Sequence, residues 1–163
     1  MTNIQKSIAD FLLSDKWPHE ILLTEPAFRV FYQGENARLI CFAQARQEEQ
    51  QFIFYSYYPD TIPDERRLAI AEFITRANYG LVLGNFELDM GDGELRFKTS
   101  IDVEGTELTH ELAKPIIYAN VLTMDDYAPG IKAVFDAEKT PLEALDLVLS
   151  KESAADSEEA AAD

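Results

Sequence analysis

One segment, residues 51–58, constrains the fold most, because it is apolar on both faces of an expected strand. Its sequence, QFIFYSYY, is dominated by residues that favour strands. Alternate side chains of a strand point to opposite faces. The first set is Phe52, Phe54 and Tyr58, and the second is Ile53, Tyr55 and Tyr57. Since a sheet with one solvated face has polar residues at every second position, this strand needs cover on both sides.

Three sources can supply that cover: the helices of the chain itself, a second copy of the chain, or a bound partner. Tyrosine suits a protein interface because it is large and amphipathic and loses little rotamer entropy on binding. The candidate surface for a partner or for a dimer is therefore made of aromatic side chains of this segment. They are Phe52, Phe54, Tyr55, Tyr57 and Tyr58.

The hydrophobic pattern along the chain predicts an α+β fold in the order αβββαββα, with helices packed against an antiparallel five-stranded sheet. Residues 38–45 are, like residues 51–58, apolar on both faces. The expected strands are 27–32, 38–45, 51–58 and the two arms of a hairpin over 84–101. The expected helices are 4–12, 63–80, a helix from Thr109 interrupted at Pro129-Gly130, and a short one over 141–149.

The hairpin is predicted in one register. Asp92-Gly93 is typical of a two-residue type I′ loop. With that loop, Leu88 faces Phe97 on an apolar side. On the other side, Glu87 faces Lys98, so opposite charges meet. A slip of one residue would break both sets of pairs.

The charge balance limits the partners. The chain has 30 acidic and 14 basic residues, a formal charge of −16. This excess argues against a nucleic acid and against an anionic membrane surface as partner. Residues 150–163 contain only Ala, Ser, Asp, Glu and Lys151, and nothing there is large enough to pack. We expect one domain over residues 1–149, followed by a disordered acidic tail over 150–163.

The sequence shows no motif for catalysis, and we predict no enzyme, cofactor or metal. Cys41 is the only cysteine and stands among apolar neighbours, so we expect a buried small side chain without a disulfide. His19 and His110 are the only histidines, and no nucleophile motif or paired metal-ligand spacing flanks them. No basic stretch followed by an apolar run opens the chain, and no apolar run reaches membrane-spanning length. We expect a cytoplasmic protein.

Several segments carry a family resemblance. They are Ala71–Gly80, Gly84–Asp89, Asp92–Lys98, Ser100–Gly105, Tyr118–Val121, Tyr127–Ile131, Tyr32–Asn36 and Gln51–Ser56. Together they resemble the YbjN family of bacteria over most of Ala27–Phe135. The resemblance implies a fold like that of the type III secretion chaperones, often dimeric. It also implies no enzymatic activity, and members of the family are described as sensory transduction regulators.

The expected function is therefore a non-enzymatic protein-binding module, chaperone-like or regulatory, that holds a segment of a partner protein on its sheet and helix surfaces. The doubly apolar strand and the missing catalytic motifs lead to this hypothesis. One alternative is a structural homodimer with no client, in which the apolar strand is the chain's own interface. Another is a small-molecule sensor, which would need a pocket with convergent polar groups.

Overall fold

Six antiparallel strands form one sheet in the computed structural model, which describes residues 3–162, with side chains except at 152, 155, 156 and 158–162. In chain order the strands are β1 His19–Ile21, β2 Ala27–Gln33, β3 Arg38–Arg46, β4 Gln51–Tyr57, β5 Asn85–Leu88 and β6 Leu95–Asp102. Their order in the sheet is β1-β2-β3-β4-β6-β5. The helices are α1 Asn3–Ser14, α2 Asp64–Gly80, α3 His110–Phe135 and α4 Pro141–Ala162.

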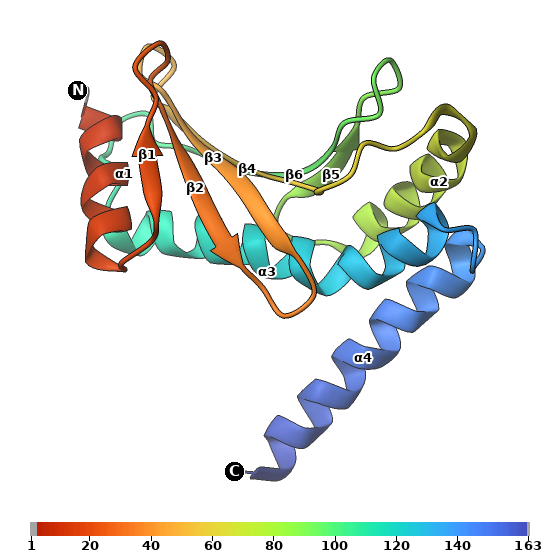
Figure 1. Ribbon diagram of the computed structural model, residues 1–163. Helices are drawn as coiled ribbons and strands as arrows, with labels where there is room; N and C mark the ends of the chain where they lie inside the picture. Colours follow the sequence, from red (N-terminus) through yellow and green to blue (C-terminus); the bar gives the residue numbers. More distant parts are fainter. Residues whose placement is uncertain (1–2, 163) are drawn as a thin grey trace.

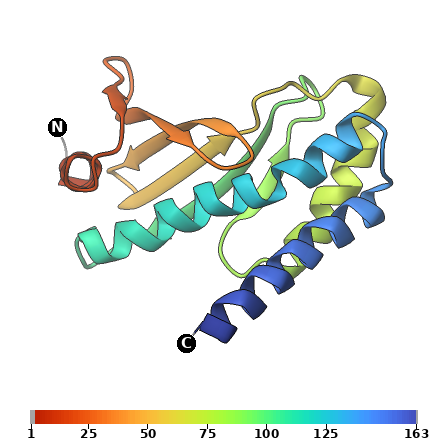
Figure 2. The same cartoon turned by 60° about the horizontal axis from the view of Figure 1, so that its bottom comes forward.

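The helices cover one face of this sheet. Figure 1 shows α3 running beneath the curved sheet, and Figure 2 shows the same helix alongside it from below. The side-chain amide of Asn120 on α3 donates hydrogen bonds to the carbonyl oxygens of Phe54 and Phe97, at 2.9 and 3.1 Å. These two hydrogen bonds connect the middle of α3 to β4 and β6. The opposite face carries no helix among the described residues.

The core lies between the sheet and the helices, and it confirms the alternation of β4. Phe52 and Phe54 are fully buried beneath the sheet, whereas Tyr55 and Tyr57 are partly exposed on the other side. Cys41 on β3 is fully buried and has no disulfide partner, as predicted. The α+β class and the antiparallel sheet are also confirmed.

The prediction of five strands in the order αβββαββα is wrong, because residues 3–162 form six strands and run αββββαββαα. The additional strand is β1, which pairs Glu20 with Arg29 of β2. Only three residues long, β1 follows Pro18 and shows no clear alternation. Its conformation comes from pairing with β2 rather than from a local pattern.

The predicted hairpin register is also wrong, by two residues. Leu88 pairs with Leu95, and the connecting loop is longer than two residues. A type I′ loop needs a positive φ at both central residues, but only Gly93 of the expected pair has one, +83°. The N–H of Asp89 instead donates to the carbonyl oxygen of Glu94 at 2.9 Å, which closes a wider loop. A shift of two residues leaves every side chain on its predicted face.

Helix α3 is continuous through Pro129-Gly130, where the sequence predicted an interruption. Thr109 caps its first turn by accepting the N–H of Leu112 at 3.3 Å. At Gly130, a Cβ atom would lie 2.7 Å from Cγ2 of Val148 and 2.8 Å from the ring of Phe73. Gly130 therefore serves close packing of α3 against α4 and α2, rather than ending the helix.

Helix α4 is longer than the predicted helix over 141–149 and continues into the expected tail. Among the described side chains of α4, Ala144 and Val148 are buried, and Leu149 is already 42% exposed. Those residues after Leu149 whose side chains are described are all exposed. The folded core thus ends near Val148, and the disorder of 150–163 stays a prediction.

Candidate functional site

The sheet face that points away from α3 is the candidate site, and we call it the outer face. Two rows of paired residues cross the middle of it. The first row is Phe31, Ile40, Tyr57 and Arg96, and the second is Arg29, Phe42, Tyr55 and Lys98. Each row has an apolar centre and ends on a cation over β6. This combination of aromatic, aliphatic and arginine side chains is typical of protein interfaces.

Aromatic rings and guanidinium groups pack against one another on the outer face. The rings of Phe42 and Tyr57 meet edge to face with centroids 5.5 Å apart. Cζ of Arg96 lies 4.4 Å from the centroid of Tyr55, and Cζ of Arg29 lies 5.8 Å from that of Phe42. Each cation–π contact of this kind contributes about 0.5–1 kcal/mol at an exposed site. These contacts hold the side chains in place before any partner binds.

Arg96 and Lys98 share one carboxylate, Glu87 of β5. Nε of Arg96 donates to Glu87 Oε2 at 2.8 Å, and Nζ of Lys98 donates to the other oxygen. Partial burial raises the pKa of Glu87, but the hydrogen bonds from the two cations outweigh it and the net pKa is lowered. Burial lowers the pKa of Arg96, and the bonds to Glu87 and Tyr57 more than reverse this. Glu87 and Arg96 therefore keep their charges near neutral pH.

Two adjoining hollows meet on this face. One, of about 610 Å³, extends over Phe42, and the other, of about 820 Å³, passes round the edge of the sheet to Trp17 and to Tyr118 of α3. They share Phe31, Arg38 and Ile40. The shared residues make one continuous groove across β2 and β3. Each hollow has the size of a typical ligand pocket.

An aromatic wall closes the groove at the sheet edge. The ring of Trp17 stacks on Tyr32 with centroids 5.5 Å apart, and it meets Tyr118 of α3 edge to face at 5.4 Å. Asp15 accepts hydrogen bonds from the hydroxyl of Tyr118 at 3.2 Å and is 2.9 Å from Nε2 of His110. The bond with His110, and secondarily that with Tyr118, lowers the pKa of Asp15. These bonds tie the end of α1 to α3 and hold the wall in position.

A buried carboxylate on α3 holds the turn between β2 and β3, next to Arg38. Asp125 accepts the backbone N–H groups of Glu35, Asn36 and Ala37 at 2.9, 3.0 and 2.8 Å. A Cβ at Gly34 would lie 2.1 Å from Oδ1 of Asp125, so the turn has room for glycine alone. Local sequence gives no signal for this clamp, because its parts lie 88 to 90 residues apart.

The predicted candidate residues divide between the two faces. Phe52 and Phe54 are fully buried on the helix side, which leaves them no surface for a partner. Tyr55 and Tyr57 lie on the outer face, and Tyr58, just past β4, lines the hollow over Phe42.

Sequence reasoning did not name the residues of β2 and β3 that belong to the groove. They are Phe31, Arg38, Ile40 and Phe42. The apolar character of both faces of 38–45 was the signal that could have found two of them.

Outside this face, the described residues provide neither a metal-binding cluster nor a reactive thiol. None of them forms a group of three or more His, Cys, Asp or Glu placed to hold a metal ion. Burial raises the pKa of the Cys41 thiol, which keeps it protonated and unreactive.

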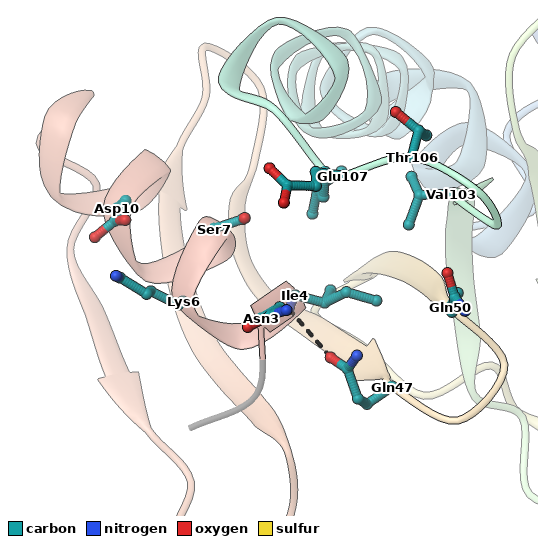
Figure 3. Close-up of a pocket in the computed structure, with 11 residues that line it drawn as sticks. Asn3, Ile4, Lys6, Ser7, Asp10, Gln47, Gln50, Val103, Thr106 and Glu107 are labelled. Atoms are coloured by element: carbon teal, nitrogen blue, oxygen red, sulfur yellow. Dashed lines mark hydrogen bonds between the residues drawn. The ribbon is translucent and has the colours of Figure 1, made fainter.

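A hollow of about 350 Å³ lies between α1 and the segment before α3, and Figure 3 shows Lys6, Gln47 and Gln50 at separate places around it. No helix within residues 3–162 is long and apolar enough to span a membrane.

Two solved structures of protein complexes share this fold. A chaperone–effector complex, HopA1–SchA, matches with a TM-score of 0.50 and 14% identity, covering 76% of this chain and 91% of that chain. The ExsC–ExsE complex matches with a TM-score of 0.55 and 12% identity, covering 77% of this chain and 90% of that chain. At such identities the likeness establishes the fold alone. It is the fold of the type III secretion chaperones.

The chain belongs to the YbjN family, "Putative bacterial sensory transduction regulator", whose profile matches residues 5–133. The crystal structure of YbjN from E. coli, described as "a putative transcription regulator", matches with a TM-score of 0.57 and 11% identity. The match covers 82% of this chain and 90% of that chain. No curated protein sequence matches the chain. The predicted family is thereby confirmed.

Proposed function

We propose that this chain is a non-enzymatic protein-binding module, chaperone-like or regulatory, that holds a segment of a partner protein in the groove of its outer face. The observation that carries the proposal is a helix-free sheet face with aromatic rows and two connected hollows. The core on the other face is complete without it. The outer face is therefore free to serve recognition.

Apolar side chains on this face are exposed to solvent, so their burial by a partner would stabilise a complex. Phe31 is 36% exposed and Ile40 is 48% exposed. Burying apolar surface stabilises a complex by roughly 25 cal/mol per Å² before the entropy of association is subtracted. Tyrosine and arginine, which surround these residues, are enriched among the side chains that dominate binding energy.

Binding across the face is favoured over extension of the sheet at β5. In the edge strand, the outward N–H of Phe86 donates to Oδ1 of Asn78 at 2.7 Å, and Nδ2 of Asn78 donates to the carbonyl oxygen of Phe86 at 3.1 Å. This clamp from α2 occupies the backbone groups that an added strand would need. A partner segment is therefore expected to use side-chain contacts on the outer face.

The comparisons support a binding role over catalysis. One structure of this fold is a chaperone with an effector, another is a complex of two proteins, and YbjN from E. coli is described as a regulator. At these identities only the fold is shared, so the partners of those proteins do not identify the partner of this chain.

Site-specific photocrosslinking in the native bacterium tests the proposal. Benzoylphenylalanine would replace Ile40 in the groove and, as the matched control, Leu68 on α2, which is 77% exposed. We expect a crosslink to another protein from position 40 and none to that protein from position 68. Equal crosslinking from both positions, or none from position 40, would contradict the proposal. A product with twice the mass of the chain would favour the homodimer.

A further inference from the structure

The outer face is much less acidic than the chain as a whole, which has a formal charge of −16. Five of the 14 basic residues project from its strands, against three carboxylates, and two further carboxylates just beyond the strands, Glu49 and Glu94, pair with two of these cations. The cations are Arg29, Arg38, Arg46, Arg96 and Lys98, and the carboxylates are Glu20, Glu87 and Asp102. A charge farther than about 8 Å is largely screened at physiological salt. A bound segment would therefore sense the charges of this face more than the distant acidic residues.

Four of the five cations already have a carboxylate partner. Arg29 pairs with Glu20 and Arg46 with Glu49, while Arg96 and Lys98 share Glu87. The exception is Arg38. Its Nε donates to Oε1 of Gln33 at 2.9 Å, and among residues 3–162 it forms no ion pair with a carboxylate.

Arg38 also occupies the central position in the groove. It lies opposite Gln33, next to the cross-strand pair of Phe31 and Ile40, in the part that both hollows share. Apolar side chains lie on each side of this charge, Trp17 in one direction and Phe42 in the other, and each hollow also has one carboxylate in its lining, Asp15 and Glu94. Its guanidinium can bind a carboxylate through two parallel hydrogen bonds.

We propose that the occupant of the groove is a peptide segment of a partner protein with an acidic residue between two large apolar residues. The carboxylate pairs with Arg38, and the apolar side chains enter the two hollows. This inference rests on the proposed protein-binding function and gives it a partner chemistry. It also distinguishes that partner from a basic segment, which would place like charges together at the centre of the groove.

Two occupants from the chain itself fit less well. A second copy packed outer face to outer face would meet Arg38 with carboxylates that already pair with cations, namely Glu20, Glu87 and Glu94. The segment 150–163 is acidic, but it has no large apolar side chain to fill either hollow. An external segment that combines both features is the best complement to this surface.

Peptide pools test the inference on the full-length protein. Three pools of fluorescein-labelled nine-residue peptides would carry Leu, Phe or Trp on both sides of a central Glu, Gln or Lys. Fluorescence polarisation would measure their binding to the wild type, to Arg38→Glu, to Arg38→Gln and to the matched control Arg76→Glu. Arg76 lies on α2 and pairs with Glu72 at 2.8 Å, away from the sheet.

We expect the wild type to prefer the Glu pool over the Lys pool by about tenfold. Arg38→Glu should reverse this order, Arg38→Gln should abolish it, and Arg76→Glu should leave it unchanged. Unfolding midpoints would verify that the variants are folded, and light scattering would record self-association.

Three results would overturn the inference. They are equal binding of all three pools, no binding of any pool, and a dimer that Arg38→Glu disrupts. The crosslink from position 40 is measured independently of the peptides. A partner captured there while the pools fail would refute the acidic segment and leave the binding function standing.

Discussion

Replacing Asp125 by asparagine should destabilise the fold by about 3 kcal/mol, because the clamp needs three acceptor positions. The carboxylate receives N–H groups from Glu35, Asn36 and Ala37, and Asp125 is only 5% exposed. An amide keeps one oxygen, which can still accept from Asn36 and Ala37. Its NH₂ group would then face the N–H of Glu35. One charge-assisted bond is replaced by two opposed donors.

The assay is equilibrium unfolding in urea followed by far-ultraviolet circular dichroism, with calorimetry for the melting temperature. At this chain length, about 3 kcal/mol corresponds to a decrease of about 6–12 °C in Tm. The urea m-value should stay the same, because the fold is unchanged.

Asp126→Asn is the matched control. Burial first, and then the neighbouring carboxylates of Asp125 and Glu35, raise the pKa of Asp126. Removing the charge of Asp126 should therefore leave stability unchanged or increase it. A loss below about 1 kcal/mol for Asp125→Asn, or an equal loss for both variants, would refute the clamp.

Three further predictions concern other parts of the fold. Gly130→Ala should destabilise by about 1–3 kcal/mol in urea unfolding, because its Cβ would meet Val148 and Phe73 at 2.7 and 2.8 Å. Because the pKa of Glu87 is lowered in the folded protein, its contribution to stability is present above its ordinary value of 4.5 and disappears as the pH falls through the folded value. The stability difference between the wild type and Glu87→Gln, measured against pH, should follow that course. Deletion of 150–163 should leave Tm nearly unchanged in calorimetry, and a large decrease would show that the tail packs.

Much of the fold could be predicted from the sequence, because the relevant signals are local. The apolar residues on both faces of β4 indicated a strand that contributes one face to the core and leaves an apolar surface on the other. The structure shows this, because Phe54 is buried and Tyr55 is partly exposed. Apolar neighbours likewise identified Cys41 as a buried residue.

The errors arose where distant contacts decide the local structure. β1 is too short for a pattern and depends on β2. Pro129 lies inside a helix because packing around Gly130 keeps α3 continuous. The groove was missed for the same reason, since Arg38 and Trp17 meet in one hollow only after the sheet has formed.

The central claim is that the outer face serves binding rather than stability, and two neighbours on β3 test it most directly. Ile40 lies on the outer face, and Leu39 is fully buried on the other. Ile40→Ser should keep Tm close to that of the wild type and lose the partner that crosslinks from a second outer-face position, Tyr55. Leu39→Ala should lower stability by about 2–5 kcal/mol. Full partner capture by a folded Ile40→Ser, or a loss of stability as large as that of Leu39→Ala, would contradict the account.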